Sequence, residues 1–266
     1  MSEQFTKADR KIIEYITNNT EMFLFSSIGE FAKQLDLSEA TVSRFVRHVG
    51  CRDYKELKRL VMRQNAVEGP AAKLAATLND DTDFSLEQWF RRQQQYLEKT
   101  LEGMGGEEFD RAAELILSAR RIFIHAKSAS ASMGQLLFFR LRRLGFDTVL
   151  LPSGGSEVLE GLVQAQKGDV VIMFSFSKVS AEGRIILRHE PEAGYRTVSF
   201  SSRTFAPQEE RADVNLYVYR GEEREYHTMT AAAALVDALV VALSRSMGSD
   251  SARNLTKLHR MKKRYM

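Results

Sequence analysis

Residues 26–45 read SSIGEFAKQLDLSEATVSRF, and this stretch decides the fold of the first part of the chain. It contains two amphipathic segments, and the short connection between them leaves room only for a tight turn. Ser27 and Glu30 have the spacing of a capping box, in which a serine oxygen and a carboxylate satisfy opposite backbone donors at a helix start. Ser38 can cap the second segment. The stretch therefore predicts a helix, a short turn and a second helix.

The same helical spacing of apolar residues runs from residue 1 to about residue 67. Side chains three and four positions apart lie on one face of a helix, so each group of them marks a buried stripe. The four groups are Ile12, Ile13 and Ile16; Ile28, Phe31, Ala32 and Leu35; Val42, Phe45, Val46 and Val49; and Tyr54, Leu57, Leu60 and Val61. We therefore expect an α-helical domain over residues 1–67.

A helix, a short turn and a capped second helix form the helix-turn-helix arrangement, whose second helix enters the major groove of DNA. Val42, Phe45 and Val46 form the buried stripe of that helix, so the residues between them face outward. Small and hydroxylated side chains permit close approach to DNA, and arginine can bond guanine or phosphate. The residues expected to read or position DNA are Ala40, Thr41, Ser43, Arg44 and Arg47.

The charge of this region supports DNA binding. Residues 38–65 contain seven basic and three acidic side chains, whereas residues 1–37 are acidic on balance. A basic face on the third and fourth helices suits a phosphate backbone, and we expect Arg52, Lys55 and Lys58 to hold phosphates. The alternative is a solvated charged face on an ordinary helical bundle.

From about residue 107 the pattern changes to short β-rich runs that alternate with amphipathic segments of helix length. Such alternation implies right-handed crossovers and a parallel sheet flanked by helices. We expect an α/β domain over residues 107–250. Its strands are expected at 121–125, 147–151, 169–175, 196–200 and 213–219, with a closing helix near 226–247.

Residues 68–106 link the two domains. Ser85 and Gln88 have the spacing of another capping box. After them we expect a connecting helix whose apolar stripe packs on the α/β domain or on a partner chain. The stripe comprises Leu86, Trp89, Phe90, Gln93, Leu97, Leu101 and Met104. Residues 251–266 form a basic C-terminal tail, either a solvated end or a non-specific contact to DNA.

Two loops that follow expected strands are rich in hydroxyl groups. Ligands bind outside the carboxyl ends of parallel strands, where the starts of helices present free amides to anions. Hydroxyls, such amides and one lysine in each loop would suit a phosphate or a carboxylate. The alternative is that the serines only cap the helices that follow. The expected anion site comprises Lys127, Ser128, Ser130, Ser175, Ser177, Lys178 and Ser180.

The combination of the two parts resembles a known family. Residues 26–45, together with YKELK at 54–58, look like the DNA-binding domain of RpiR-type bacterial transcriptional regulators. KGDVVI at 167–172, followed by Ser175 and Ser177, is similar to the sugar isomerase (SIS) domain of these regulators. The resemblance implies a cytoplasmic repressor or activator, dimeric or tetrameric, that binds double-stranded operator DNA. It also implies that the SIS domain senses a phosphorylated sugar.

Both loops depart from the pattern of the family. The first usually reads Gly-x-Gly-x-Ser, and residues 126–130 read AKSAS; the other usually reads Ser-x-Ser-Gly-x-Thr, and residues 175–180 read SFSKVS. Glycine lets the backbone approach a phosphate and adopt a positive φ, so side chains at these places restrict both. We therefore expect an altered anion, assisted by Lys127 or Lys178 as a flexible point donor. A SIS domain kept only for oligomerisation is the alternative.

Other functional classes have less support in the sequence. The only cysteine, Cys51, excludes an intramolecular disulfide framework and fits a reducing cytoplasm. The histidines His48, His125, His189 and His259 form no metal-ligand pattern, so we expect neither a metal nor a cofactor. No run approaches about 18 consecutive apolar residues and the N-terminus lacks the apolar core of a signal peptide, so we expect no membrane span.

Two alternatives to a ligand-responsive regulator stay open at this point. Sugar-phosphate isomerases share the SIS fold, and Glu182 with His227 could act as a catalytic acid and base, although their spacing is not diagnostic. A DNA-binding protein that only oligomerises, without any effector, is the second alternative.

Overall fold

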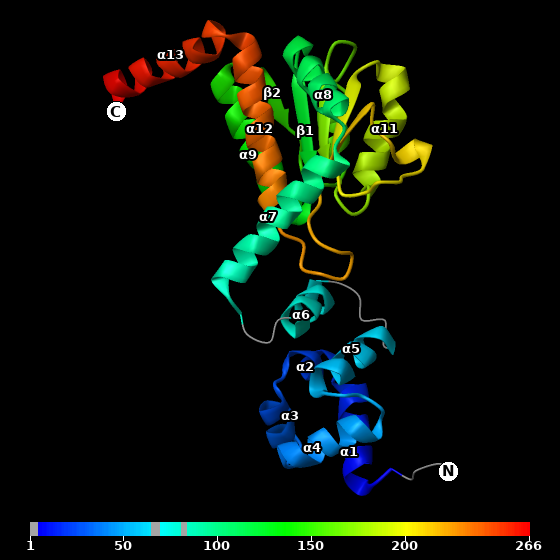
Figure 1. The fold of residues 1–266 in the computed structure, drawn as a ribbon. Helices are drawn as coiled ribbons and strands as arrows, with labels where there is room; N and C mark the ends of the chain where they lie inside the picture. Colours follow the sequence, from blue (N-terminus) through cyan, green and yellow to red (C-terminus); the bar gives the residue numbers. More distant parts are fainter. Residues whose placement is uncertain (1–4, 65–69, 81–83) are drawn as a thin grey trace. The chain divides into compact units, whose positions relative to one another are not determined.

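The computed structural model describes residues 5–64, 70–80 and 84–266 (Figure 1). The chain forms two compact units. The helical unit comprises Met1–Trp89 together with Gly221–His227, and the α/β unit comprises Phe90–Arg220 and Thr228–Met266. The expected fold class, a helical domain followed by an α/β domain with a parallel sheet, is confirmed.

The helical unit contains two more helices, α2 and α6, than the four apolar stripes predict. Its helices are α1 (Lys7–Asn18), α2 (Thr20–Phe25), α3 (Ile28–Gln34), α4 (Glu39–His48), α5 (Tyr54–Gln64) and α6 (Pro70–Asp80). The short helix α2 was not expected, and it buries Phe23 and Leu24 in the core of the unit. Ala75 of α6 is fully buried in the same core, so helical packing continues beyond residue 67, where the sequence placed the boundary.

Five parallel strands form the sheet of the α/β unit, in the order β2-β1-β3-β4-β5. The strands are β1 (Ile122–Ala126), β2 (Thr148–Leu150), β3 (Val170–Phe174), β4 (Arg196–Ser201) and β5 (Val214–Tyr217). The helices are α7 (Leu86–Gly103), α8 (Gly106–Ser118), α9 (Ala131–Leu144), α10 (Glu157–Leu162), α11 (Ala181–Ala193), α12 (Thr230–Met247) and α13 (Ser249–Tyr265).

Apolar side chains alternate along the strands and build a core on each face of the sheet. Ile122 and Ile124 of β1 belong to the larger core, which α8, α9 and α12 cover. Phe123 points to the opposite face, where α10 and α11 cover a smaller core around Tyr195. Figure 1 shows α9 and α12 together on one side of the strands and α11 on the other. Both faces are therefore buried, as expected of a parallel sheet.

The connecting helix is present as α7, but its buried face differs from the stripe that the sequence indicated. Gln93, Tyr96 and Thr100 are the buried side chains. Thr100 accepts a hydrogen bond from the Tyr219 amide at 3.0 Å, and the Thr228 hydroxyl donates to the Gln93 amide oxygen at 2.8 Å. Polar side chains thus fix α7 to its own domain, and the large apolar residues Leu86, Phe90, Leu97 and Leu101 are exposed.

Within the described residues, one helix has the length and composition of a membrane span, namely α12. Its side chains Ala231, Ala232, Leu235, Val236, Leu239 and Leu243 are buried in the larger core. The core helix of a globular domain passes the same test of length and composition, and this burial explains the apolar sequence of α12. The basic segment after it, 251–266, is helical and forms most of α13, which has no buried side chain.

Candidate functional site

The second helix of the helix-turn-helix pair, α4, is held by its cap and by its buried stripe. The Ser38 side chain accepts a hydrogen bond from the Thr41 amide at 3.1 Å, so the helix begins where the sequence indicated. The turn before it reverses at Asp36, whose φ of 52° lies in the left-handed region. Val42 and Phe45 are buried, and the opposite face of α4 is open to solvent.

The outward face of α4 carries the five residues expected to read or position DNA. Ala40, Arg44 and Arg47 are exposed, and Thr41 and Ser43 are half-buried. Arg44 donates to the Thr41 hydroxyl at 3.2 Å and to the Ala40 carbonyl at 3.4 Å, so its guanidinium lies against the start of α4. The first turn of such a helix is the part that meets base edges in a major groove.

The three residues expected to hold phosphates differ in their surroundings. Arg52 is exposed and pairs with Glu56 at 3.1 Å, and Lys55 is half-buried. Lys58 is 7% exposed, and its ammonium lies 5.2 Å from the centre of the Tyr54 ring. Burial lowers the pKa of Lys58 although Glu30 acts in the opposite direction. This burial does not fit a phosphate contact, because an ammonium must reach the protein surface to touch DNA.

A histidine–carboxylate contact that the sequence reasoning missed supports the far end of α4. His48 Nδ1 lies 3.1 Å from a carboxylate oxygen of Asp9, which is only 6% exposed. Burial raises the pKa of Asp9, but hydrogen bonds from Thr6 and His48 outweigh that effect and hold the pKa below its ordinary value. The contact joins α1 to the last turn of α4 and so helps to fix the orientation of α4. Its partners are 39 positions apart in the chain, so no local pattern could have revealed it.

At the carboxyl ends of β1 and β3, the structure brings Lys127 to a carboxylate. Lys127 Nζ lies 2.9 Å from Glu182 Oε1, and the hydrogen bond from Lys127 is the main cause that lowers the pKa of Glu182 to about 2. A Cβ atom at Gly154 would lie 3.0 Å from the same oxygen and 3.3 Å from Lys127 Nζ. The glycine-containing loop after β2 therefore lies close against this ion pair.

Ser180 and His125 lie beside the ion pair. The Ser180 hydroxyl accepts a hydrogen bond from the Gly183 amide at 3.0 Å and so caps α11. His125 Nε2 is 3.5 Å from the same hydroxyl, and burial lowers the pKa of His125, which favours its neutral form. His125 was not among the expected anion-site residues, because a single histidine at the end of a strand carries no distinguishing pattern.

Ser177 belongs to a second polar group on the same edge of the sheet. Arg220, 7% exposed at the end of β5, donates to the Ser177 hydroxyl at 3.1 Å and to the Ser202 hydroxyl at 3.2 Å. Its guanidinium lies 4.1 Å from the centre of the Phe176 ring. Burial lowers the pKa of Arg220 to about 10, which leaves the side chain cationic at neutral pH. Sequence reasoning missed Arg220 because it follows a different strand from Ser177.

The other expected anion-site residues are not gathered at one point. Ser128 is exposed and adopts a φ of 54°, and Lys178 is exposed. The Ser130 hydroxyl donates back to the Lys127 carbonyl at 2.8 Å. Ser175 is buried and lines a cavity of about 390 Å³ together with Ser199 and Ser201 of β4 and Arg203, which follows that strand.

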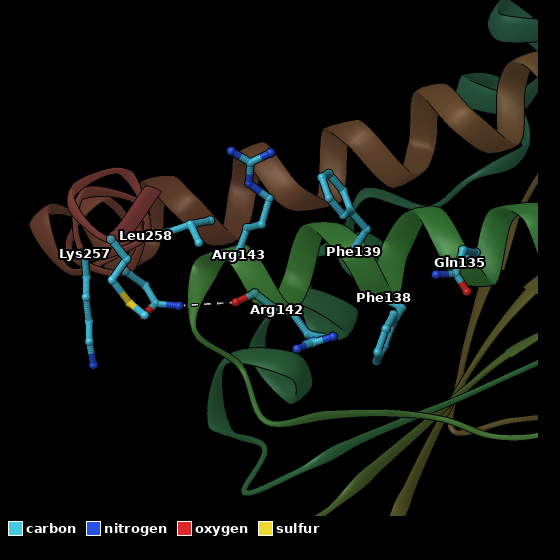
Figure 2. A pocket seen from close by; sticks show the side chains of 9 residues that line it. Gln135, Phe138, Phe139, Arg142, Arg143, Lys257 and Leu258 are labelled. Atoms are coloured by element: carbon cyan, nitrogen blue, oxygen red, sulfur yellow. Dashed lines mark hydrogen bonds between the residues drawn. The ribbon is translucent and has the colours of Figure 1, made fainter. Parts of the chain in front are cut away.

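A separate groove of about 500 Å³ lies between α9 and α13 (Figure 2). Phe138 and Phe139 line it, and the guanidinium groups of Arg142 and Arg143 lie 5.1 Å from the centres of these two rings. Helix α9 begins at the carboxyl end of β1, so its last turns lie toward the opposite edge of the sheet. The groove is therefore not part of the strand-end site.

The described residues offer little support for metal or acid–base chemistry. No group of three or more metal-ligating side chains occurs among them. Cys51 is buried, and burial raises the pKa of its thiol, which disfavours the reactive thiolate. Glu182 belongs to the α/β unit and His227 to the helical unit, so no catalytic pair is defined within one unit.

Two segments of the chain match known protein families. Residues 1–67 match the helix-turn-helix domain of the rpiR family, and residues 115–242 match the SIS domain. The chain belongs to the RpiR family. It is an HTH-type transcriptional regulator that carries a SIS domain, as the capped helix pair and the parallel sheet had indicated.

Similar proteins agree with this assignment over most of the chain. An uncharacterized HTH-type transcriptional regulator from Caldanaerobacter subterraneus is 26% identical over 260 residues, which cover 96% of this chain and 92% of that protein. The Vibrio vulnificus NanR protein complexed with ManNAc-6P aligns with a TM-score of 0.61 at 20% identity, covering 99% of this chain and 96% of NanR. The sugar isomerase domain of an RpiR transcription factor from Sphaerobacter thermophilus aligns with a TM-score of 0.60 at 23% identity. The alignment covers 65% of this chain and 97% of that structure.

Proposed function

We propose that this RpiR-family regulator binds operator DNA through α4 and changes its operator affinity when a small anion binds in the SIS domain. The anion is of the sugar phosphate class or a related metabolite, and the protein acts in the cytoplasm as a homo-oligomer. Within this proposal, Arg44, Arg47, Thr41, Ser43 and Ala40 contact or approach bases, and Arg52 and Lys55 hold phosphates. Lys58 has a structural role against Tyr54 instead.

The observation that carries the ligand proposal is the pair of cationic groups at one edge of the sheet. Lys127 lies at the end of β1, and Arg220 donates to Ser177 after β3. Positive charges beside exposed hydroxyls, at the carboxyl ends of parallel strands, are the chemistry that binds a phosphate. The similar fold of NanR, which is complexed with ManNAc-6P, supports a phosphosugar as the class of ligand.

A thermal-shift screen of the full chain against sugar phosphates and small carboxylic acids tests this proposal. A ligand at 100 times its dissociation constant should stabilise the fold by about 2.7 kcal/mol. The same ligand should change the affinity for operator DNA, and Ser177→Ala should remove this response while leaving DNA affinity unchanged. A full response in Ser177→Ala would place the ligand elsewhere.

The second candidate is a SIS domain that only assembles the protein. The observation in its favour is that Glu182 already neutralises Lys127, so part of the expected anion site is occupied by the protein's own carboxylate. Under this alternative no compound in the thermal-shift screen raises the melting temperature of the well-folded protein, and no compound changes its affinity for DNA.

A further inference from the structure

One face of β4 is polar, although this strand lies between two others in a parallel sheet. Val198 and Phe200 enter the larger core. The residues that alternate with them on the opposite face are Thr197, Ser199 and Ser201. Parallel strands inside a sheet normally carry apolar side chains on both faces, because helices cover both. The row of hydroxyl groups on β4 therefore indicates that something other than an apolar core occupies this face.

The cavity of about 390 Å³ lies over the polar face of β4, within the α/β unit. The connection from β4 to β5, residues 202–213, contains the single 3₁₀ turn η2 (Gln208–Glu210) where parallel strands are usually joined by an α-helix. This short connection leaves room above Ser199 and Ser201, which line the cavity. Pockets for small molecules measure roughly 300–1,000 Å³, and one water takes about 30 Å³, so the cavity has the size of a ligand site.

Two hydroxyl groups of the cavity are buried and make no hydrogen bond within the described part of the chain. They belong to Ser175 and Ser199, which are 7% and 4% exposed. By contrast, the Thr197 hydroxyl, on the same face of β4, donates to the Asp213 carboxylate at 3.0 Å. Buried hydroxyl groups are normally satisfied, and each can donate one hydrogen bond and accept two. Ser175 and Ser199 therefore present both donors and acceptors to an occupant of the cavity.

The acidic side chains of the cavity are paired with arginines. The pairs are Arg203–Glu210 at 2.6 Å, Arg196–Asp213 at 2.8 Å and Arg111–Glu108 at 3.0 Å. The hydrogen bond from Arg203 is the main cause that lowers the pKa of Glu210, so both members of this pair are charged at neutral pH. An anion would have to compete with Glu210 for Arg203, and a cation would have to compete with Arg203 for Glu210. The pairing favours a neutral occupant.

We propose that this cavity binds a small neutral polyol, such as a sugar alcohol or an unphosphorylated sugar. Each hydroxyl group of a polyol donates and accepts hydrogen bonds, as the hydroxyl groups of Ser175 and Ser199 do. The guanidinium of Arg203 has five N–H donors, so it can serve a hydroxyl group of the ligand while it stays paired with Glu210. Phosphate is excluded from this site because it offers acceptors only and carries a charge that the cavity does not balance.

The polyol site is separate from the anion site of the proposed function. The guanidinium of Arg220 lies against Phe176, which belongs to the larger core, and the cavity lies on the opposite face of the sheet. The proposal assigns Ser175 to the cavity, whereas the sequence had grouped it with Ser177. It stands whether or not an anion binds beside Arg220.

Isothermal titration calorimetry of the full chain with ribitol, glucitol and glucose tests the proposal. The wild type should bind at least one of them, and Ser199→Val should raise its dissociation constant at least about 10-fold, because valine removes the hydroxyl group and fills part of the cavity. Valine suits a strand and Ser199 makes no hydrogen bond within the described residues, so this variant should melt no lower than the wild type. Thr197→Val is the matched control on the same face of β4. It should melt lower, because it loses the bond to Asp213, and it should bind the polyol unchanged.

Ser177→Ala, titrated with the same polyols and with glucose 6-phosphate, separates this proposal from the proposed function. The variant should bind the polyol as the wild type does. Loss of polyol binding in Ser177→Ala, equal polyol binding by Ser199→Val and the wild type, or no binding of any of the three polyols would each overturn the proposal. Polyol binding that requires Ser199, without any binding of glucose 6-phosphate, would support the cavity and count against the proposed function alone.

Discussion

Lys127 and Glu182 form an ion pair of 2.9 Å across the carboxyl ends of β1 and β3. The lysine lies in a loop that departs from the glycine-rich pattern of the family, and the glutamate lies in the first turn of α11. An anion that approaches the start of α11 would compete with Glu182 for the same ammonium group. Within the proposed function, we therefore expect the ion pair to affect both the stability of the fold and the choice of anion at this edge of the sheet.

The pKa of Glu182 leads to a prediction about stability and pH. Since the folded pKa of about 2 lies below the ordinary value of 4.5, the contribution of Glu182 is present above about pH 4.5 and is lost as pH falls from there toward 2. Glu182→Gln should lower the free energy of unfolding by about 1–2 kcal/mol at pH 6. Urea unfolding at pH 6 and pH 3 checks this. Glu160→Gln, at an exposed position, is the control, and an equal loss at both pH values would contradict the role assigned to the ion pair.

Ser128 occupies the place of a glycine in the family pattern and has a φ of 54°. A left-handed backbone is strained for a residue with a Cβ atom, and glycine relieves that strain. We expect Ser128→Gly to raise the free energy of unfolding by about 0.5–1 kcal/mol, net of the greater freedom of glycine in the unfolded chain. Ser132→Gly, within α9, should instead lower it by about 0.5–1 kcal/mol. Chemical denaturation of both variants measures their free energies of unfolding. Destabilisation by Ser128→Gly would contradict the prediction, because the serine would then make a contact that stabilises the fold by more than the backbone strain costs.

Gly134 allows α9 to approach β1 closely. A Cβ atom added there would lie 2.8 Å from Cβ of Ala126 and 3.4 Å from a methyl carbon of Ile124. Gly134→Ala should therefore lower the free energy of unfolding by about 1–3 kcal/mol. The double variant Gly134→Ala/Ala126→Gly removes the first clash and should recover part of the loss. Thermal unfolding of the wild type, the variants Gly134→Ala and Ala126→Gly, and the double variant gives the coupling energy between the two positions. If the two single effects on the free energy of unfolding simply add in the double variant, the predicted clash between these residues is absent.

Arg44 is expected to read sequence and not only to attract phosphate. Arg44→Ala should reduce discrimination between an operator obtained by in vitro selection and random DNA by about 1–3 kcal/mol. Arg52→Ala is the comparison, because loss of a phosphate contact weakens both DNAs alike and reduces the salt dependence. Fluorescence anisotropy titrations at several salt concentrations measure both effects. Unchanged discrimination by Arg44→Ala would refute its role in base recognition.

Most of the helix boundaries in the helical unit follow from local sequence. Ser27, Glu30 and Ser38 act on backbone groups three residues away, so their effect is encoded within a single turn. The short helix α2 escaped prediction because six residues are too few to establish a helical period. The parallel sheet was also predictable, because its strands are short β-rich runs between amphipathic helices.

The candidate site was only partly predictable. Sequence alone named Lys127 and Ser177, but it could not supply their partners Glu182 and Arg220, which are 55 and 43 positions away. The sequence also indicated Lys58 as a phosphate contact, because a count of charges does not reveal which basic side chain is buried in the folded domain.

The sequence by itself determined the two domain types, the capped helix-turn-helix pair and the strand ends where an anion could bind. These features depend on interactions over a few residues, which caps and apolar periodicity encode directly. The tertiary structure alone decided that Lys58 is buried, that Glu182 neutralises Lys127, and that α7 packs through polar residues. Each of these depends on which distant segments meet, and burial and pairing across long separations are properties of the folded chain, not of any local stretch.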